Sequence, residues 1–447
     1  MSNFLRKNII VVGLGVSGRS AVDYCLRKNW SCTVIDTRAV PPGLNEFQQC
    51  YPEVEFIHAD LTQFDFSKFD QVVLSPGISI DEPMIQEALN QGIEVVGDVE
   101  LFLREIEVPV IAITGSNGKS TVCDLLGHCL NHVGIKTEVA GNIGTPVLSL
   151  LEQPQPDVYV LELSSFQLET ISSLKAAVAC VLNVTPDHLD RHLNMANYAA
   201  IKYRIYQGAS AAVVNLNDEF NGLLPSAEFA GKVSTFGFAS GDYTVTSNAS
   251  GYQVELPDNQ VLDESMFLLK GHHNGLNIAA VCAVLNAFNV AIESDLIAAL
   301  ASYRGLPHRC ELVRSNDGIT WINDSKATNP GAAAAAINGF SNHGKSLFVI
   351  AGGDAKGNDL SEFIDAVKRH AKQCFVFGQD AERISEQLDN RLCESVRDLN
   401  QAVDKSRKVA TPGDVVLLSP ACASIDMYPN YMARGEHFKA LVGGLHG

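Results

Sequence analysis

The chain has 447 residues, and at roughly 100 to 200 residues per domain this length predicts two or three domains. Its 46% apolar and 19% charged residues are typical of a compact folded protein and exclude a disordered chain. The formal net charge of -18 argues against general attraction to nucleic acid or to anionic membranes. Any anionic substrate must therefore meet locally placed Lys and Arg side chains.

Cysteine usage and hydropathy indicate where the protein works. The 11 cysteines are scattered without a single Cys-x-x-Cys pair, so neither a disulfide framework nor a zinc ribbon is indicated, and a reducing compartment suits them. The first apolar run, Ile9 to Val12, stops at Gly13, which is too short for a signal peptide, and no later segment reaches the roughly 20 apolar residues of a membrane span. We expect a cytoplasmic protein.

The first predicted element is a strand over Ile9 to Val12, followed by a Gly13-x-Gly15-x-x-Gly18 turn. Asp36 ends the next predicted strand. In dinucleotide-binding proteins this pattern combines a tight glycine turn with an acid that binds a ribose. The pattern alone leaves a nucleotide site and a purely structural βα turn equally open, and it does not distinguish NAD from other nucleotides.

A second strand, Val110 to Ile113, leads into Gly115-Ser116-Asn117-Gly118-Lys119-Ser120-Thr121 at the start of a helix. Consecutive loop amides and a helix N-terminus favour phosphate oxygens, a lysine can neutralise β and γ charge, and a hydroxyl can bind magnesium. The usual spacing places glycine where Ile113 stands, so this is a variant loop. It predicts phosphate binding.

Two acidic or histidine-bearing segments follow. Val158 to Glu162 reads as an apolar strand that ends in an acid, where a carboxylate can hold magnesium beside a phosphate loop. His188 and His192 stand four apart, which a helix would place on one face, but the Glu of the zinc protease pattern is missing between them. We therefore expect a magnesium or phosphate role for His188 and interpret His192 as a polar surface residue.

The last third of the chain contributes two polar segments. Asn274 and Asn277 share a helical face, where amides either grip a nucleotide or satisfy the backbone. Residues 323–329 crowd polar groups at the end of a predicted strand, and Asn329 followed by Pro330 predicts the start of a helix. We place domain boundaries near Gly97 and near Gly305, where the pattern of elements changes.

Taken together, these segments resemble the Mur ligases, and within that family the members that add D-glutamate. The most specific matches are the 115–121 loop, Asn142 within Gly141-Asn142-Ile143-Gly144, residues 323–329, and residues 418–424. The resemblance covers almost the whole chain. It implies an α/β fold in three domains: a Rossmann-like domain over 1–97 for a UDP-sugar, a central P-loop ATPase-type parallel sheet over 98–305, and a Rossmann-like domain over 306–447 for D-glutamate.

The resemblance also implies roles for individual residues. Those expected to bind the UDP-sugar are Val16, Ser17, Asp36, Thr37, Arg38, Ser75, Pro76, Gly77, Asn142 and His188. Those expected to bind ATP are Gly115, Ser116, Asn117, Gly118, Lys119, Ser120, Thr121, Asn274, Asn277, Arg309 and Asp324. Those expected around D-glutamate are Lys326, Thr328, Lys356, Ser424 and Tyr431, the last where the family pattern leads us to expect Phe. The implied magnesium ligands are Ser120, Glu162, His188 and Lys202, with Lys202 carbamylated, and the implied catalytic residues are Lys119, His188, Lys202 and Asn142.

The function implied by the resemblance is an ATP-dependent amide-bond ligase that uses magnesium, with two ions expected. It would join D-glutamate to UDP-N-acetylmuramoyl-L-alanine through an acyl phosphate, in cytoplasmic peptidoglycan precursor synthesis for the cell wall. We expect a monomer with no nucleic-acid partner and no stable membrane association. Another Mur-type amino acid ligase is the nearest alternative. An NAD-dependent oxidoreductase would leave the phosphate loop unexplained. A non-catalytic nucleotide switch would hold or hydrolyse ATP without joining substrates.

Overall fold

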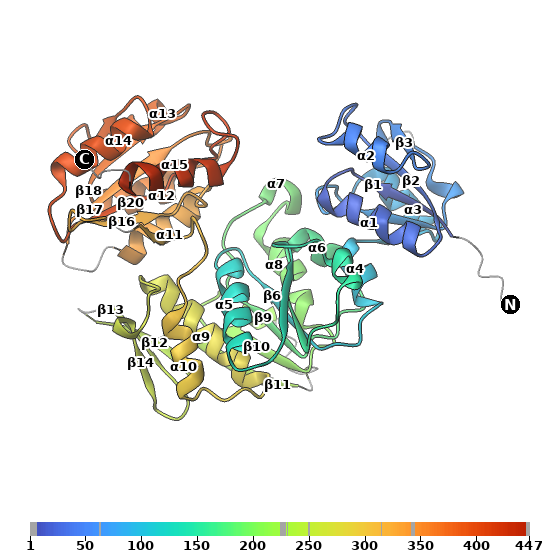
Figure 1. Ribbon diagram of the computed structural model, residues 1–447, viewed down its shortest axis with the longest axis horizontal. Helices are drawn as coiled ribbons and strands as arrows, with labels where there is room; N and C mark the ends of the chain where they lie inside the picture. Colours follow the sequence, from blue (N-terminus) through green and yellow to red (C-terminus); the bar gives the residue numbers. More distant parts are fainter. Residues whose placement is uncertain are drawn as a thin grey trace.

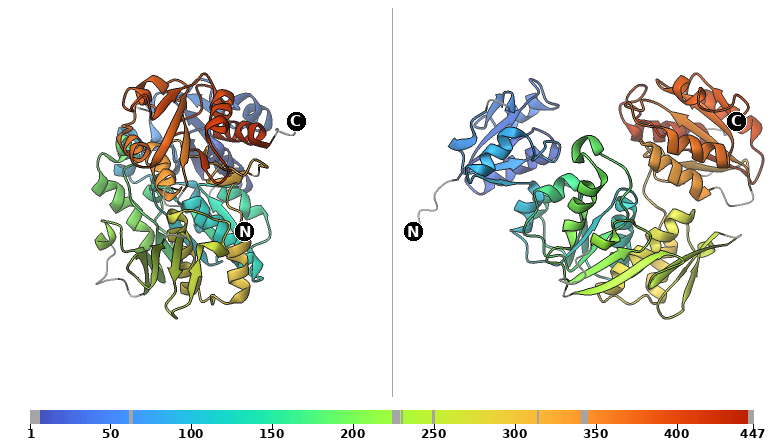
Figure 2. Two further views of the ribbon diagram at one scale, coloured as in Figure 1. Left: turned by 90° about the vertical axis from the view of Figure 1, so that its left-hand side faces the viewer. Right: turned by 180° about the vertical axis from the view of Figure 1, so that it is seen from behind.

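The computed structural model describes residues 7–61, 64–223, 229, 231–248, 251–313, 315–340 and 345–443. Their strands form three separate sheets of five, nine and six strands. Figure 1 shows the N-terminal and C-terminal blocks on either side of the central one, and Figure 2 shows the same arrangement from behind. The α/β class and the three-block architecture expected from the sequence are confirmed.

The first sheet is parallel, with the order β3-β2-β1-β4-β5. From β1 the chain adds β2 and β3 on one side of the sheet and then β4 and β5 on the other. Ligands of such sheets bind where this change of side occurs, outside the carboxyl ends of the strands. Its strands are β1 (Asn8–Val12), β2 (Ser31–Asp36), β3 (Glu55–His58), β4 (Gln71–Leu74) and β5 (Glu94–Val96). Its helices are α1 (Val16–Arg27), α2 (Leu44–Cys50), η2 (Phe66–Lys68) and α3 (Pro83–Asn90).

The central sheet has the order β14-β13-β12-β11-β10-β9-β6-β8-β7. It is parallel from β7 to β12, as expected, but β13 and β14 extend it with antiparallel pairs. The β13–β14 connection, residues 256–260, is too short for the helical crossover that a parallel pair needs. The strands are β6 (Val110–Thr114), β7 (Thr137–Gly141), β8 (Val158–Glu162), β9 (Val178–Val181), β10 (Ala211–Asn215), β11 (Lys232–Phe238), β12 (Tyr243–Asn248), β13 (Gly251–Glu255) and β14 (Val261–Asp263).

Helices cover the central sheet and connect its strands. The longer ones are α5 (Lys119–His132), α8 (Met195–Tyr203), α9 (His272–Ala287) and α10 (Ser294–Ser302). The shorter ones are α4 (Asp98–Leu103), α6 (Ser165–Glu169), α7 (Leu189–His192), η3 (Val147–Glu152), η4 (Arg204–Tyr206), η5 (Asn221–Leu223) and η6 (Glu264–Met266). In Figure 1, α7 rises from the central block between the other two.

The third sheet has the order β15-β16-β20-β17-β18-β19 and is parallel except for the β15–β16 pair. Asn329 accepts a hydrogen bond of 2.8 Å from the backbone N–H of Ala332, which confirms its predicted place at the start of α11. The strands are β15 (Glu311–Val313), β16 (Thr320–Asn323), β17 (Leu347–Gly352), β18 (Ala371–Phe377), β19 (Cys393–Ser395) and β20 (Val415–Leu418). The helices are α11 (Pro330–Phe340), α12 (Ser361–His370), α13 (Ala381–Ser385), α14 (Leu399–Val409) and α15 (Tyr431–Gly443).

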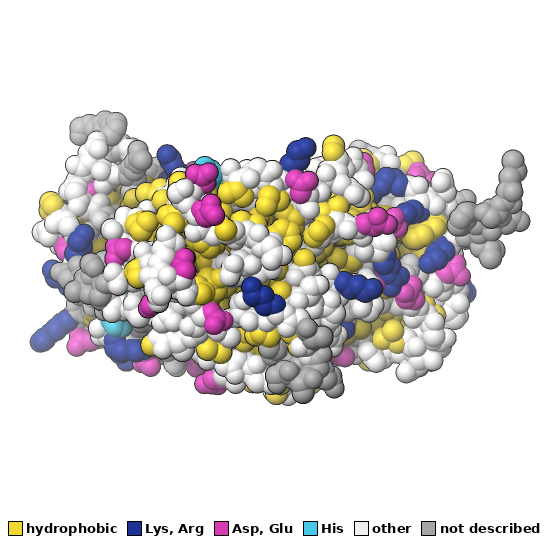
Figure 3. All heavy atoms as spheres, turned by 90° about the horizontal axis from the view of Figure 1, so that it is seen from below, with side chains coloured by type: hydrophobic (Ala, Val, Ile, Leu, Met, Phe, Trp, Pro, Cys, Tyr) yellow, Lys and Arg dark blue, Asp and Glu magenta, His cyan; other side chains and the backbone are white. Residues whose placement is uncertain are grey.

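The face seen from below in Figure 3 shows apolar side chains gathered near its middle and charges of both signs around them. Because Lys and Arg are interspersed there with Asp and Glu, the described residues of this face form no basic patch that would attract a polyanion. Among the described residues, no helix has the length and apolar character that crossing a membrane requires.

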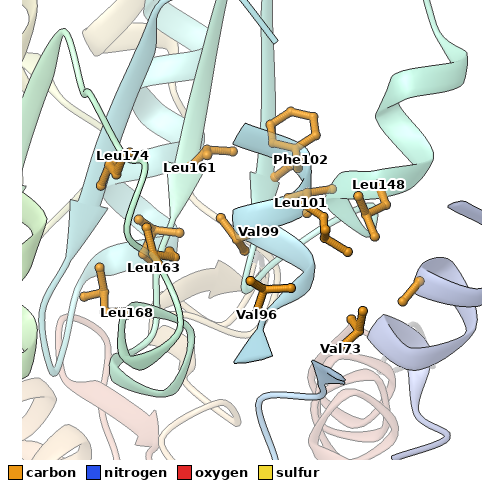
Figure 4. Packing of buried hydrophobic residues seen from close by; sticks show 14 of the residues in the cluster. Val73, Val96, Val99, Leu101, Phe102, Leu148, Leu161, Leu163, Leu168 and Leu174 are labelled. Atoms are coloured by element: carbon orange, nitrogen blue, oxygen red, sulfur yellow. The ribbon is translucent and has the colours of Figure 1, made fainter. Parts of the chain in front are cut away.

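The first and central sheets share one buried apolar cluster. Val73 and Val96 of the first sheet, Val99 and Phe102 of α4, and Leu148 of η3 belong to this cluster (Figure 4). The buried residues of the third sheet form clusters of their own. Burial of apolar surface is the main cohesive term between packed elements, so the first block is fixed to the central one more firmly than the third block is.

Candidate functional site

The phosphate-loop candidate lies between β6 and α5 and folds back on itself. Gly118 has φ of 83°, and a Cβ there would approach Asn277 Oδ1 to 2.6 Å, so the loop needs glycine at this position. Lys119 Nζ donates to the carbonyls of Gly115 and Ser116 at 2.7 and 2.9 Å. Burial lowers the pKa of Lys119. The Lys119 amine therefore lies inside the phosphate loop, bonded to its backbone carbonyls at the N-terminus of α5.

The loop is held from outside by the segment that follows β9. Asn183 accepts from the backbone N–H of Asn117 at 2.8 Å and donates to its carbonyl at 3.0 Å. The Ser116 hydroxyl donates to the Thr185 carbonyl and accepts from the Thr185 backbone N–H, each at 3.0 Å. Sequence reasoning gave Asn183 and Thr185 no role, although their place directly after a strand beside β6 was a signal.

A pocket of about 300 Å³ opens beside this loop, between the central and third blocks. Arg309 reaches across the junction and donates to the Ser120 hydroxyl at 2.9 Å. Within the pocket wall, Asn277 donates to Asn274 Oδ1 at 2.9 Å, which confirms that the two amides share a helical face. The residues of the expected ATP set that line the pocket are Asn117, Gly118, Thr121, Asn274, Asn277, Arg309 and Asp324.

Asp324 is the acid of this pocket. It directly follows β16, is buried, and accepts hydrogen bonds from the Ser419 hydroxyl at 2.8 Å and the Cys310 backbone N–H at 3.2 Å. Burial raises the pKa of Asp324 to about 7, against the lowering effect of these two donors. Its charge therefore changes near neutral pH.

Glu162 stands at the carboxyl end of β8, next to β6, with 1% of its surface exposed. Its Oε1 accepts from Asn142 Nδ2 at 2.8 Å, and its backbone carbonyl accepts from the Asn142 N–H at 2.8 Å. Its Oε2 is buried and has no hydrogen-bond partner among the described residues. A buried carboxylate oxygen without a donor is a ready ligand for a cation.

Lys202 of α8 points at the phosphate loop. Its side chain is almost fully buried, its Nζ donates to the Gly115 carbonyl at 2.9 Å, and its ammonium lies 4.6 Å from the centre of the Tyr198 ring. Burial, followed by the charge of Lys119, lowers the pKa of Lys202 well below its ordinary value. Two lysine amines thus share one carbonyl oxygen, and the pKa of each is lowered by burial.

His188 precedes the short helix α7 with φ of 52°, and His192 is the last residue of that helix. Their rings lie 4.9 and 5.4 Å from the Phe166 ring, so both contact one aromatic side chain, although His188 lies outside the helix that was expected to place them on one face. The interpretation of His192 as a surface residue is wrong, because only 3% of it is exposed and its ring stacks between Phe166 and Tyr198. Its Nε2 lies 2.9 Å from the Ser165 hydroxyl. Docking of α7 against α6 and α8 buries it.

A second pocket, of about 600 Å³, lies between the first and central blocks. Arg38 forms a bidentate pair with Asp36 at 2.7 and 2.9 Å, and Leu14 donates its backbone N–H to the same carboxylate at 2.8 Å. Burial raises the pKa of Asp36, but these donors outweigh it and bring the pKa to about 2. The residues of the expected UDP-sugar set that line the pocket are Val16, Ser17, Asp36, Thr37, Arg38, Ser75, Pro76, Gly77 and Asn142. His188 is the member outside it.

The residues expected around D-glutamate are only partly brought together. Lys326 lines the 300 Å³ pocket, and its ammonium lies 4.1 Å from the centre of the Tyr431 ring. Thr328 donates its backbone N–H to the Lys326 carbonyl at 2.8 Å. Ser424 is buried in the loop after β20, and Lys356 is exposed in the loop after β17 with φ of 52°. These residues therefore lie in separate loops at the carboxyl edge of the third sheet and do not all line one pocket.

Sequence reasoning missed Arg434 of α15, which joins the loops at that edge. It is fully buried and donates to Ser325 Oγ and O at 3.0 Å each, to the Cys422 carbonyl at 3.1 Å and to the Gly352 carbonyl at 3.3 Å. Burial lowers the pKa of Arg434 to about 10. The only sequence signal was an arginine one helical turn after Tyr431.

The chain is similar to known proteins in each of its three blocks and over nearly its whole length. Family descriptions match as "Mur ligase MurD-like, N-terminal domain" over residues 7–97, "Mur ligase middle domain" over 113–285, and "Mur ligase, glutamate ligase domain" over 308–422. The chain is 40% identical over 442 residues to the UDP-N-acetylmuramoylalanine--D-glutamate ligase of Pseudoalteromonas translucida, with 98% of this chain and 97% of the relative covered. It is 42% identical over 444 residues to the ligase of the same name from Legionella pneumophila strain Paris, with 98% and 99% covered.

Solved structures with the same fold include MurF ligase from Thermotoga maritima in complex with ADP, with a TM-score of 0.64, 18% identity, and 99% of this chain and 97% of that one covered. MurC from Thermotoga maritima gives a TM-score of 0.59 at 18% identity, with 97% and 98% covered. At this identity the likeness shows the fold alone. The full-length similarity to the curated relatives, together with the three matched family domains, shows that the chain belongs to the Mur ligase family.

Proposed function

We propose that the chain is an ATP-dependent ligase that adds D-glutamate to UDP-N-acetylmuramoyl-L-alanine, forming an amide bond, ADP and phosphate. The observation that carries the proposal is the hydrogen bond of 2.8 Å from Asn142 to Glu162. Asn142 lines the pocket that holds the expected UDP-sugar residues, and Glu162 ends the strand beside the phosphate loop. The names of the relatives support the choice of substrates.

The reaction needs ATP because a carboxylate is a poor electrophile and oxide is not a usable leaving group. In the proposed mechanism the alanyl carboxylate of the sugar nucleotide attacks the γ-phosphorus of ATP and gives an acyl phosphate. The amine of D-glutamate then attacks the acyl carbonyl, and phosphate leaves. Lys119 at the N-terminus of α5 is placed to stabilise the negative charge that develops on the transferred phosphoryl group.

Magnesium is used with ATP in this family, and the residues present fit it. Among the described residues no three His, Cys, Asp or Glu side chains cluster, but magnesium beside a phosphate needs only one or two carboxylates. The buried, unpaired Oε2 of Glu162 and the Ser120 hydroxyl would hold the ion, which supplies positive charge that neutralises the phosphate oxygens. His188 and Lys202 are the further ligands proposed for a second ion.

Lys202 would need a negative group to serve as a ligand. Only an unprotonated amine reacts with carbon dioxide to give a carbamate, and the pKa of Lys202 is held well below its ordinary value by burial. We propose that Lys202 is carbamylated. We also propose catalytic roles for Lys119, His188 and Asn142, together with the remaining contacts to the UDP-sugar and ATP. Asn142 lines the 600 Å³ pocket, and Lys119 lies in the phosphate loop.

The acceptor amino acid is proposed to bind at the carboxyl edge of the third sheet. Lys326 and Lys356 would pair with its two carboxylates, and Thr328, Ser424 and Tyr431 would add hydroxyl groups. Because these residues lie on the third block and the phosphate loop lies on the central block, we propose that the third block moves towards the phosphate loop for the reaction. Such closure would also exclude water from the acyl phosphate.

Residues 1–97, 98–305 and 306–447 would thus form the UDP-sugar, ATP and D-glutamate domains. A monomeric state and a cytoplasmic location stay predictions, which sedimentation and cell fractionation would test. The proposed function is tested by phosphate release with ATP, UDP-N-acetylmuramoyl-L-alanine and D-glutamate, with each omitted in turn. Phosphate release and amide formation should need all three. Release that ignores D-glutamate and yields no amide would overturn the proposal.

A further inference from the structure

Arg191 of α7 connects the central domain to the first domain at the edge of the larger pocket. Its Nη2 donates to the Ile78 carbonyl at 3.0 Å and its Nη1 donates to the Pro76 carbonyl at 3.4 Å. Pro76 and Ile78 belong to the turn after β4 that lines this pocket. The same guanidinium forms an ion pair with Glu169 of α6. One side chain therefore touches both domains.

The ion pair is largely withdrawn from water, with 13% of the Arg191 side chain and 6% of the Glu169 side chain exposed. The Nε of Arg191 is buried and has no hydrogen-bond partner among the described residues, so its bonds run through the two terminal nitrogens. A planar guanidinium can serve a carboxylate and two carbonyls at once, whereas a lysine ammonium at one point cannot reach all three.

The helix that carries Arg191 depends on such anchors. α7 has four residues and lies between His188 and Leu193, which have φ of 52° and 68°. A single helical turn is not stable alone, so tertiary contacts fix its position. The Arg191 guanidinium lies 4.6 Å from the centre of the Phe166 ring, and the His188 ring lies 4.9 Å from the same ring. Movement of Arg191 would therefore move His188.

We propose that Arg191 is a positioning residue for the ligase reaction: it fixes His188 relative to the Ser75–Ile78 turn. It thereby sets where the carboxylate of the bound sugar nucleotide lies with respect to the reacting phosphate. This inference rests on the proposed function. Arg191 does not line either pocket in the described residues, so it acts through His188 and the turn and not by touching substrate.

Arg204 provides a matched control. It also donates to two backbone carbonyls, those of Glu169 at 3.2 Å and Ile171 at 3.0 Å, but both lie within the central domain. Arg191→Lys and Arg204→Lys therefore remove the same kind of bond, and only the first removes bonds between the domains. Both variants keep the positive charge, so Glu169 is not left as a buried charge without a cation.

The test measures KM for each substrate with the full-length protein and both variants. Arg191→Lys is expected to raise KM for UDP-N-acetylmuramoyl-L-alanine at least about tenfold, because hydrogen bonds from a charged donor each stabilise by an amount of that order. KM for ATP should stay within about twofold, because the phosphate loop is held by other contacts. Arg204→Lys should change neither KM.

A second variant, Arg191→Gly, should regain part of its turnover when guanidinium chloride is added at millimolar concentration. An Arg191→Lys protein with wild-type KM for the sugar nucleotide, or with both KM values raised equally, would overturn the inference. An Arg204→Lys protein with the same selective defect would overturn it as well. Absence of amide formation by the wild-type protein would instead overturn the proposed function, so the two failures are distinguishable.

Discussion

Asn142 donates a hydrogen bond of 2.8 Å to one carboxylate oxygen of Glu162, and the second oxygen of that carboxylate is buried without a partner among the described residues. An unpaired buried polar atom costs roughly 1 to 3 kcal/mol, and more when it is charged. The cost is offset only when a ligand satisfies that oxygen. The pair therefore joins the 600 Å³ pocket to the strand beside the phosphate loop, and the unpaired oxygen is the atom proposed above to bind magnesium.

The first prediction concerns this atom. Glu162→Gln should raise the magnesium concentration needed for half-maximal turnover at least about tenfold, because a neutral amide is a weaker ligand than a carboxylate. Its melting temperature should equal or exceed that of the wild type, since a neutral amide is cheaper to bury. Magnesium titration of phosphate release and thermal unfolding measure both. Glu138→Gln, on the neighbouring strand β7, is the control, and an unchanged magnesium dependence in Glu162→Gln would contradict the assignment.

The second prediction concerns Lys202. Because burial and the charge of Lys119 lower its pKa, Lys202 is unprotonated at a pH where an exposed lysine is charged, and it should form a carbamate there. With ¹³C-labelled bicarbonate, NMR should show a carbamate signal that is lost in Lys202→Ala. That variant should lose most of its turnover and regain part of it with added formate or acetate. Full turnover by Lys202→Ala would refute carbamylation. It would also be refuted if the wild type showed no carbamate signal and short carboxylates did not rescue Lys202→Ala.

The third prediction concerns pH and Asp324. Its pKa rises from an ordinary 3.8 in the unfolded chain to about 7 in the folded protein, so the folded state binds the extra proton between these values. The free energy of unfolding contributed by this group therefore falls as pH rises from about 4 to about 7. Asp324→Asn should flatten that part of the stability curve, as measured by urea unfolding at several pH values. Equal slopes for variant and wild type would contradict the assignment.

The fourth prediction concerns Arg434, which donates to three loops at the edge of the third sheet. Arg434→Lys keeps the charge but cannot make the four bonds, so it should destabilise the protein by about 2 to 4 kcal/mol. It should also raise KM for D-glutamate more than KM for ATP, because Lys326 and Ser424 lie on the loops it joins. Arg407→Lys on α14, whose arginine lies 5.3 Å from the centre of the Trp321 ring, is the control. Equal effects on both KM values would show that Arg434 acts on folding alone.

The fifth prediction concerns domain closure. The first and central domains share a buried apolar cluster, and the third domain has its own clusters, so the third domain should be the one that moves. Small-angle scattering should show compaction when an ATP analogue, the sugar nucleotide and D-glutamate are bound together. A fluorophore pair on the third and central domains should change distance, and a pair on the first and central domains should not. Constant distances in both pairs would contradict closure.

The sequence by itself determined the local parts of the molecule. The glycine turn after β1, the phosphate loop before α5 and the Asn329 cap of α11 depend on residues close together in the chain, whose backbone conformations and hydrogen bonds are set locally. Acids at strand ends, Asp36 and Glu162, were also predictable, because the carboxyl ends of parallel strands meet at one edge of a sheet. The most specific part of the family resemblance likewise rested on short segments: the 115–121 loop and residues 141–144, 323–329 and 418–424.

Only the tertiary structure decided which separate segments meet. The bond from Arg309 to Ser120 and the approach of Lys202 to the Gly115 carbonyl join residues far apart in the chain. His192 was interpreted as a polar surface residue, yet packing of α7 buries it. Arg191 and Arg434 carried no recognisable pattern. Burial and hydrogen-bond partners are properties of the packed fold, so the pKa of a lysine or the unpaired oxygen of a glutamate emerges only when distant elements are in place.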